Sequence, residues 1–463
     1  MSDLPENRAA VCAKLATRFG ARATTNNDVR RQHAVNAFGH TANQPADIVV
    51  FVESEDEVVE IVKLCHATRT PIVPFGTGTS FEGQTNAPHG GVCIDVSRMN
   101  AILQVNADDL DCRVQPGVTR KQLNAYLRDM GLHFPIDPGA DASLGGMTAT
   151  RASGTNAVRY GTMKDNVLSV RVVLPDGSVM RSASRARKSS AGYDLTRLMV
   201  GSEGTLGVFT EITLRLHPIP EGISAGSCSF PSIRAACDAA IVALQAGLTI
   251  GRVELLDTAL VRAVNAYSKL ALPETPLLLF EFSGAESQVA EQAKQFAEIA
   301  TDHGGGDFKW TTQTEERARL WQARHDAFLA ALTLRPGAAP VTTDVCVPIS
   351  RLAECVEATN ADVQAAGFVA VVGGHIGDGN FHVTLLIDPA SEQEMQAIDA
   401  FMDTLVKRAI DMDGTCTGEH GIGQNKNEYL VREFDAAGVA AMRAIKTALD
   451  PLNIMNPGKI LPA

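Results

Sequence analysis

The sequence predicts an α+β protein built from several lobes. At roughly 150 residues per domain, 463 residues suggest about three domains or lobes. Before residue 222, a capped helix, short strands and a hairpin are expected. After residue 222, expected helices alternate with expected strands. This order fits helices packed on one face of an antiparallel sheet.

The N-terminal half begins its regular structure with a helix over residues 54–69. Ser54 and Glu57 have the spacing of a capping box, and apolar residues follow at helical intervals. The other elements expected in this half are short strands at 71–74, 91–96 and 102–114, a helix at 119–130, a hairpin at 167–181 and a strand at 208–216. Residues 138–161 show no regular periodicity, which is typical of a functional or disordered segment. The breaker-rich segment 217–222 predicts a domain boundary.

The second half carries five expected helices and five expected strands. The helices are expected at 231–247, 286–303, 316–332, 350–366 and 391–412. The strands are expected at 252–255, 276–283, 343–347, 368–373 and 381–387. A long helix at 427–449 and an irregular tail end the chain.

Composition excludes several classes of protein. Asp and Glu number 53 against 41 Lys and Arg, giving a net charge of −12. Nucleic-acid binding is therefore not expected, because it needs a basic surface. The nine cysteines are scattered and form no CxxC pair. This argues against a disulfide framework, a zinc ribbon or an iron–sulfur cluster.

No targeting or membrane-spanning segment is apparent. No apolar run reaches the ~18–20 residues that a membrane span needs. Residues 1–24 carry Asp3 and Glu6 and lack a compact apolar region, which argues against a signal peptide. We therefore expect a soluble cytoplasmic protein and leave peripheral contact with the inner membrane open.

Three glycine-rich segments are candidate ligand-binding loops. Residues 74–80 lack the third glycine of a dinucleotide fingerprint, since position 81 is Phe81. Nicotinamide binding is therefore disfavoured, but the backbone N–H groups of such a loop can bind pyrophosphate. Residues 143–154 and 201–207 are similarly small, so their backbone can lie flat against a planar ligand. Each segment alone is also compatible with an ordinary loop.

Residues 373–382 are the strongest candidate for chemistry. Apolar strands flank a Gly-Asp-Gly turn, which predicts a hairpin with His375 and His382 nearly symmetric about the turn. Cross-strand neighbours lie ~5 Å apart at Cβ, so both imidazoles can share one metal ion.

A second charged pair lies in residues 418–423, where Glu419 and His420 are adjacent among glycines. In extended backbone their side chains point in opposite directions, so one can bind a metal while the other faces a substrate. Two His and one carboxylate form a recurrent ligand set for divalent ions. Ordinary core or surface roles remain the alternative for all four residues.

Arg324 lies on an expected helix. Its guanidinium can bind a carboxylate with two hydrogen bonds. The alternative is a solvated charge paired with Asp326 or Glu316.

Seven segments occur together and in order over most of the chain. They are residues 74–80, 137–140, 154–162, 201–207, 374–382, 418–421 and 456–459. With these segments the sequence resembles the FAD-dependent D-2-hydroxyacid dehydrogenases of the vanillyl-alcohol-oxidase superfamily. That group contains cytochrome-type D-lactate dehydrogenases, glycolate oxidase catalytic subunits and D-2-hydroxyglutarate dehydrogenases.

The resemblance implies a fold and a flavin site. Residues 1–221 would form a PCMH-type FAD-binding domain of two α+β subdomains, and residues 222–420 a cap with a ferredoxin-like antiparallel sheet. Residues 421–463 would return to the FAD domain. The implied FAD-binding residues are Pro74, Gly76, Thr77, Gly78, Thr79, Ser80, Pro138, Gly139, Ser143, Gly145, Gly146, Thr150, Ser153, Gly154, Gly161, Glu203, Gly204, Val208 and Asn456. Residues 74–83 contain no His, so we expect non-covalent FAD.

The resemblance also implies roles for the charged residues. His375, His382 and Glu419 would hold a divalent metal, Zn²⁺ or Mn²⁺. Arg324 would bind the carboxylate of a 2-hydroxy acid, and His420 would take the hydroxyl proton. A hydride from C2 would pass to the flavin N5. The electrons would then go to a cytochrome, a quinone, an electron-transfer flavoprotein or oxygen. A homodimer is left open.

One position bears on the substrate. Relatives that use hydroxyglutarate tend to carry Asn two residues after the second His, where this chain has Thr384. We therefore expect D-lactate or a similar short D-2-hydroxy acid, with D-2-hydroxyglutarate and glycolate as alternatives. Two remoter alternatives are the flavin adduct chemistry of alkyldihydroxyacetonephosphate synthases and a non-catalytic flavoprotein subunit. The intact GHxGDGNxH pattern, with Glu419 and His420, argues against both.

Overall fold

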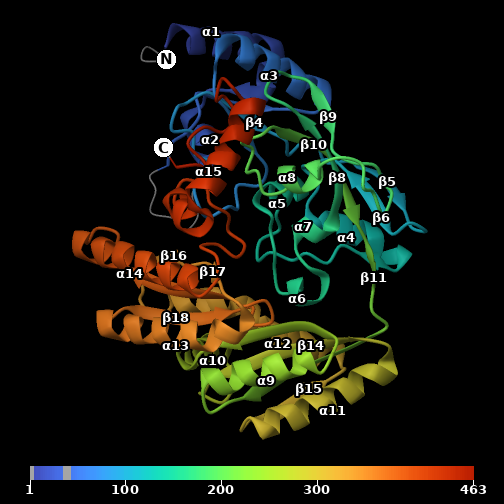
Figure 1. Cartoon of the computed structure of the whole chain (residues 1–463), viewed down its shortest axis with the longest axis vertical. Coiled ribbons are helices and arrows are strands. Elements are labelled where there is room, and N and C mark those ends of the chain that lie inside the picture. Colours follow the sequence, from blue (N-terminus) through green and yellow to red (C-terminus); the bar gives the residue numbers. More distant parts are fainter. Residues whose placement is uncertain (1–4, 35–42, 463) are drawn as a thin grey trace. The chain divides into compact units, whose positions relative to one another are not determined.

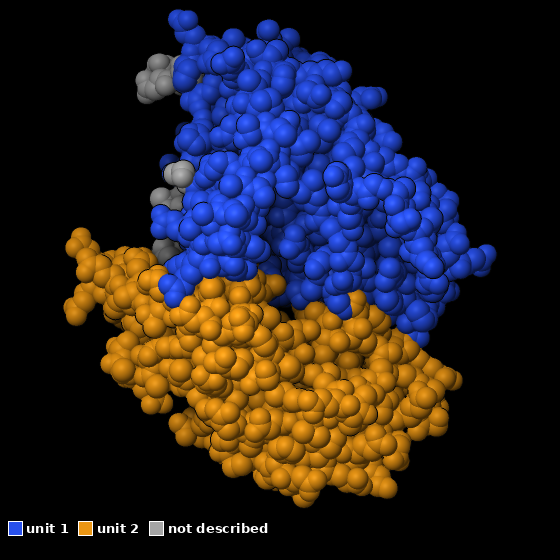
Figure 2. Space-filling model, viewed as in Figure 1, with its two compact units in different colours: residues 1–153, 161–219, 419–463 blue, residues 154–160, 220–418 orange. Residues whose placement is uncertain are grey.

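The computed structural model describes residues 5–34 and 43–462. The chain forms two compact units, coloured separately in Figure 2. Unit 1 comprises residues 1–153, 161–219 and 419–463, and unit 2 comprises residues 154–160 and 220–418. The mixture of helices and sheets in the two units confirms the predicted α+β class. The domain limits at 221 and 420 stay predictions.

The first sheet of unit 1 has the order β1-β2-β4-β3, and Figure 1 labels its strand β4. Its strands are β1 (Ala23–Thr24), β2 (Ile48–Phe51), β4 (Val92–Asp95) and β3 (Ile72–Phe75), of which the last three run parallel. Helix α3 (Glu55–Thr68) begins where the sequence predicts, since the Ser54 side chain accepts a hydrogen bond from the Glu57 N–H. The expected capping box is only half formed. The Glu57 carboxylate instead pairs with Arg22 and accepts from the Glu53 N–H.

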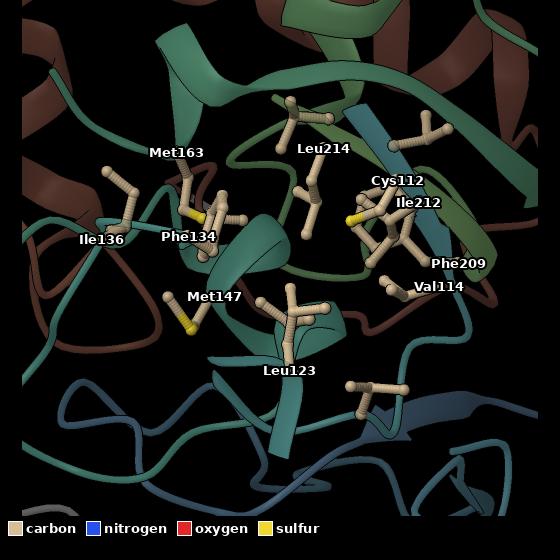
Figure 3. Close-up of a cluster of buried hydrophobic side chains, with 14 of the residues drawn as sticks. Cys112, Val114, Leu123, Phe134, Ile136, Met147, Met163, Phe209, Ile212 and Leu214 are labelled. Atoms are coloured by element: carbon tan, nitrogen blue, oxygen red, sulfur yellow. The ribbon is translucent and has the colours of Figure 1, made fainter. Parts of the chain in front are cut away.

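The second sheet of unit 1 is antiparallel and has the order β5-β6-β10-β8-β9. Its strands are β5 (Ile102–Asn106), β6 (Asp111–Val114), β10 (Val208–Arg215), β8 (Val167–Val173) and β9 (Val179–Arg181). Helix α4 (Arg120–Leu127) packs into the same core. Figure 3 shows Leu123 of α4 with Val114 and Ile212 of the strands, and all three are fully buried. This core is mostly aliphatic and also contains Phe134 and Phe209.

Residues 138–161 contain helices that the sequence pattern does not reveal. Helix α5 (Leu144–Thr150) is capped by the Ser143 hydroxyl, which accepts from the Gly146 N–H at 3.3 Å. A short helix, α6 (Ala157–Tyr160), follows. Neither helix was predicted from the sequence. Close packing explains why α5 shows no apolar stripe. A Cβ added at Gly145 would lie 2.6 Å from Pro116, so this position holds glycine where a helix would otherwise show an apolar side chain.

The C-terminal segment belongs to unit 1. The expected helix at 427–449 is a 3₁₀ turn followed by α15 (Leu430–Leu449), which is kinked at Asp435. Beyond it, Met455 forms a parallel bridge with Ile72 of β3. The tail therefore extends the first sheet.

Unit 2 is built on one antiparallel sheet with the path β15-β12-β14-β13-β18-β19-β16. Its strands are β15 (Gly306–Thr311), β12 (Gly222–Ser229), β14 (Leu277–Gly284), β13 (Ile250–Leu256), β18 (Val369–Gly374), β19 (Asn380–Ile387) and β16 (Ala339–Thr342), and β17 (Val345–Cys346) also pairs with β19. β12 and β15 were not predicted. β12 is rich in Gly and Ser and lacks the apolar alternation that identifies a strand.

Helices cover both faces of this sheet. The helices of unit 2 include α9 (Ile233–Gln245), α10 (Thr258–Ser268), α11 (Glu286–Asp302), α12 (Thr314–Leu332), α13 (Ile349–Ala366) and α14 (Glu392–Asp411). In β14, Leu279 packs in a core cluster with Trp321 of α12. The next residue, Phe280, contacts Phe296 of α11, with ring centroids 4.6 Å apart. Since successive strand residues point to opposite faces, the expectation of helices on one face is wrong.

Two further expectations bear on the chain's environment. Within residues 5–34 and 43–462, no helix combines the length and apolar character needed to cross a bilayer. All nine cysteines are free thiols, and eight of them are buried.

Candidate active site

The loop after β3 is packed against the start of α5 in unit 1. A Cβ added at Gly76 would lie 2.3 Å from the Ser143 hydroxyl oxygen, so only glycine fits there. The Ser143 N–H donates to the Thr77 hydroxyl at 3.3 Å. Two of the three glycine-rich segments are therefore neighbours, and their backbone and hydroxyl groups lie together.

The third glycine-rich segment joins the same cluster. The Glu203 N–H donates to the Ala149 carbonyl of α5 at 2.9 Å. Gly204 approaches Pro74, since a Cβ there would lie 2.9 Å from that ring. The Asn456 side-chain amide donates to the Glu203 carbonyl at 2.7 Å. Four segments that are distant in sequence thus surround one region of unit 1.

One polar atom in this cluster fits a bound ligand. The Asn456 side chain is buried, and its amide nitrogen donates to the carbonyls of Glu203 and Gln84. Its carbonyl oxygen Oδ1 has no hydrogen-bond partner in the described part of the chain. A buried acceptor of this kind is costly unless a donor reaches it. A cofactor with N–H or O–H groups would supply that donor.

For some of the other expected FAD-binding residues, the structure gives only their place in the fold. Val208 opens strand β10. Around Gly139 an added Cβ would meet nothing within 4 Å, so this position is open. Ser153 belongs to unit 1, whereas Gly154 belongs to unit 2.

The hairpin that carries the two histidines forms as predicted in unit 2. His375 directly follows β18, and His382 lies in β19 opposite Gly373. The imidazole centroids are 5.5 Å apart with an interplanar angle of 83°. One ring nitrogen from each lies within 4.8 Å of the other. The pairing is diagonal across the strands, and the two rings are close enough to share one ion.

The other nitrogen of each ring is fixed by a hydrogen bond. Nδ1 of His375 lies 2.5 Å from a carboxylate oxygen of Glu254. Nδ1 of His382 lies 3.0 Å from the Thr343 carbonyl oxygen. Both acceptors require a proton on Nδ1, so Nε2 is the nitrogen of each ring through which a metal ion could be bound. This arrangement is typical of metal-ligating histidines.

Arg324 on α12 also contacts Glu254. Its Nε donates to the second carboxylate oxygen at 2.7 Å. Burial raises the pKa of Glu254, but the neighbouring His375 and Arg324 outweigh it and hold this pKa below its usual range. Asp326, one of two alternative partners considered for Arg324, accepts hydrogen bonds from Ser268 and Gln322.

The chain leading to Glu419 is held beside the hairpin. The Asp344 carboxylate accepts hydrogen bonds from the Asn380 side chain at 2.8 Å and from the Thr417 hydroxyl at 2.7 Å. Gly418 is the last residue of unit 2, and Glu419 is the first residue of the next segment of unit 1. One peptide bond joins them, which spans ~3.8 Å between Cα atoms.

His420 is positioned in unit 1 by an aromatic ring and a carboxylate. Its imidazole stacks on Phe81, with centroids 4.3 Å apart and an angle of 9°. Its Nδ1 lies 3.7 Å from the Glu82 carboxylate, which also pairs with Lys426 at 3.3 Å. Burial raises the pKa of Glu82, but Lys426 and His420 outweigh it and lower that pKa. Phe81 and Glu82 therefore hold the imidazole of His420 in place.

Comparisons with known proteins assign these units to a family. Residues 46–183 match the FAD binding domain family, and residues 219–460 match the family of FAD linked oxidases, C-terminal domain. A relative from Danio rerio, "Probable D-lactate dehydrogenase, mitochondrial", is 50% identical over 94% of this chain and 88% of its own length. A relative from Arabidopsis thaliana, "D-lactate dehydrogenase [cytochrome], mitochondrial", is 47% identical over 97% of this chain and 80% of its own length.

The chain belongs to the FAD-dependent D-2-hydroxyacid dehydrogenases. The fold agrees, since the structure of p-cresol methylhydroxylase matches 99% of this chain and 98% of that one. That match has a TM-score of 0.82 at 18% sequence identity, and it shows the fold alone. The expected PCMH-type fold is confirmed.

The expected cytoplasmic location is wrong. Both relatives are named as mitochondrial proteins, which contradicts the expected location. The sequence argument rested on the lack of an apolar signal region. Such a test detects secretory signals and says nothing about import into other compartments.

Three residues of the site escaped the sequence analysis. Glu254 contacts His375 across 121 positions of sequence, and Glu82 and Asp344 support the site from distant loops. Glu254 carried one signal, because it is a lone acid in the apolar strand β13. A charge in such a strand is seldom kept without a partner.

Proposed function

We propose that this chain oxidises D-lactate to pyruvate with non-covalently bound FAD and passes the electrons to a cytochrome. The observation that carries the proposal is the paired histidine site of unit 2 in a chain 50% identical to a relative named as a D-lactate dehydrogenase. The name of the Arabidopsis relative supports a cytochrome as the acceptor. Residues 74–83 contain no His for covalent flavin attachment.

The residues of unit 1 fit a flavin. Thr77, Ser143 and neighbouring backbone N–H groups would hold the pyrophosphate without a basic side chain. Asn456 would supply its unsatisfied carbonyl oxygen to a flavin donor.

The residues of unit 2 fit a divalent metal. His375 and His382 would bind it through Nε2, and Glu419, one peptide bond beyond Gly418, would complete a set of two imidazoles and one carboxylate. Zn²⁺ and Mn²⁺ both accept these ligands.

FAD held by the unit 1 loops would supply the acceptor for a hydride from C2, and a divalent ion held by His375, His382 and Glu419 would lower the pKa of the substrate hydroxyl. Arg324 binds the substrate carboxylate and orients C2. His420 takes the hydroxyl proton on Nε2, because its Nδ1 faces Glu82. The C2–H bond breaks with its electron pair, the C–O bond becomes a carbonyl, and the proton remains on His420.

Thr384 supports a short substrate. It lies two residues after His382 in β19, so both side chains are on one face of the sheet. Its hydroxyl lies 3.5 Å from the Thr342 hydroxyl, and its side chain is buried. A compact, mostly uncharged neighbour of this kind suits the methyl group of D-lactate better than a second carboxylate.

Anaerobic stopped-flow bleaching of the FAD-loaded protein tests the proposal. D-lactate should bleach the flavin fastest, with D-2-hydroxyglutarate and glycolate slower and L-lactate inert. Faster bleaching by D-2-hydroxyglutarate would reassign the substrate. A flavin that none of the D-2-hydroxy acids reduces would refute the proposed reaction.

A further inference from the structure

Glu254 is a fully buried carboxylate in the middle of a sheet. It lies in β13, its exposed fraction is 0%, and its neighbours Val253 and Leu255 are buried apolar residues. Burying an unpaired carboxylate costs several kcal/mol, so a sequence keeps one only where it is paired. The two partners of this carboxylate therefore indicate its role.

The two oxygens of Glu254 contact different functional groups. Oε1 lies 2.5 Å from Nδ1 of His375, and Oε2 accepts from Nε of Arg324 at 2.7 Å. Neither bond uses Nε2 of His375 or the two terminal nitrogens of Arg324. Those atoms are the ones that a metal ion and a substrate carboxylate would bind.

The local fold makes this bridge rigid. Arg252, Glu254 and Leu256 share the face of β13 that α12 covers, since the Arg252 guanidinium lies 5.0 Å from the Trp321 ring of α12. On the neighbouring strand β18, Gly374 pairs with Leu255, and His375 follows directly. The register of the sheet and the packing of α12 thus place His375 and Arg324 next to the same carboxylate.

We propose that Glu254 is a positioning residue, which fixes the metal ligand His375 and the substrate-binding Arg324 with one carboxylate and thereby sets the metal and the substrate carboxylate relative to each other. This inference rests on the proposed function. A carboxylate behind a ligating histidine fixes its tautomer and raises its affinity for the metal. A carboxylate at Nε of an arginine fixes the plane of the guanidinium, so its terminal nitrogens keep one orientation.

The test compares three proteins loaded with FAD: the natural chain, Glu254→Gln and the control Glu281→Gln. Glu281 lies on the adjacent strand β14 and pairs with Arg252 instead, at 3.9 Å. Affinity for Zn²⁺ and Mn²⁺ is measured against a competing chelator. KM and kcat for D-lactate are measured at saturating metal.

Glu254→Gln should weaken metal binding by about 10–100-fold, the usual effect of losing a partner behind a metal ligand. At saturating metal it should raise KM for D-lactate by about tenfold or more with a smaller change in kcat, because a loosened Arg324 binds the substrate carboxylate less well. Flavin content should stay normal, and Glu281→Gln should match the natural chain in all measurements. Natural affinity and natural KM in folded Glu254→Gln would overturn the inference.

A second variant covers the case in which Glu254→Gln does not fold. Glu254→Asp keeps the buried charge but shortens the side chain by one methylene, so it cannot reach both partners. Weaker metal binding in this variant supports positioning, and unchanged binding contradicts it. If the natural chain itself binds no metal or is not reduced by D-lactate, the proposed function fails, and that result is visible before any variant is made.

Discussion

At the scale of single residues, the site depends on groups held by precise local contacts. His420 lies against Phe81, with ring centroids 4.3 Å apart, and its Nδ1 lies 3.7 Å from the Glu82 carboxylate. A histidine titrates near ~6.5 when unperturbed, which suits a group that gains a proton during turnover at neutral pH.

His420→Ala should abolish flavin reduction by D-lactate while leaving FAD bound, because it removes the proton acceptor and none of the expected FAD-binding groups. Loss of a general base typically lowers the rate by about 10²–10⁴-fold. Single-turnover absorbance at the flavin band measures the rate, and the bound flavin is quantified in the same sample. His303→Ala, at the end of α11, is the control. Unchanged reduction in His420→Ala would remove this residue as the base.

Asp257 should make the stability of unit 2 depend on pH. It caps α10 by accepting the Leu260 N–H at 2.7 Å, and burial raises its pKa to about 6. The unfolded carboxyl has a pKa near ~3.9, so between these values the folded state holds more protons. Stability from this group is therefore highest at low pH and falls as pH rises from about 4 to about 6.

Asp257→Asn keeps the cap acceptor and removes the titration. Relative to the natural chain, this variant should gain about 1–2 kcal/mol between pH 4 and pH 7, a figure reduced for the solvent contact that the side chain retains. Urea unfolding at both pH values measures the difference. Parallel pH dependence in the two proteins would show that Asp257 does not titrate in this range.

At the scale of elements, the β18–β19 hairpin places both histidines. Its turn contains Gly379, whose φ is +78° and where an added Cβ would lie 2.0 Å from the Val347 carbonyl oxygen. That carbonyl oxygen is a backbone atom, so the main chain at Val347 would have to shift to make room for a side chain. The turn thus fixes where His375 leaves the sheet.

Gly379→Ala should therefore weaken metal binding while unit 1 keeps its flavin, because His375 and His382 belong to unit 2 and the glycine-rich loops belong to unit 1. Metal and flavin contents of the same purified protein measure the split. Gly337→Ala is a matched control, since Gly337 also has a positive φ but has open space around it. Equal metal content in both variants would show that the turn does not control the histidines.

Local patterns predicted the elements with clear periodicity or turn chemistry. The hairpin of residues 373–382 was predicted because its turn glycines and its flanking apolar residues lie next to one another in the sequence. By contrast, β12 and α5 were missed, since small residues pack closely without an apolar stripe. Glu254 was missed because its contacts with His375 and Arg324 join strands and a helix far apart in sequence.

At the scale of the whole molecule, each unit carries part of the chemistry. Unit 1 gathers the glycine-rich loops and His420, and unit 2 gathers the histidine pair, Glu254 and Arg324. Glu419 and His420 are adjacent in the sequence, so the proposed third metal ligand directly precedes the proposed base.

The most direct test of this account follows flavin bleaching by D-lactate in one anaerobic preparation whose metal content is measured throughout. We predict rapid bleaching as purified, loss of bleaching after chelation with the flavin still bound, and recovery when Zn²⁺ or Mn²⁺ is added. Undiminished bleaching in protein shown to be free of metal would contradict the central claim that a metal held by His375, His382 and Glu419 presents the substrate to the flavin.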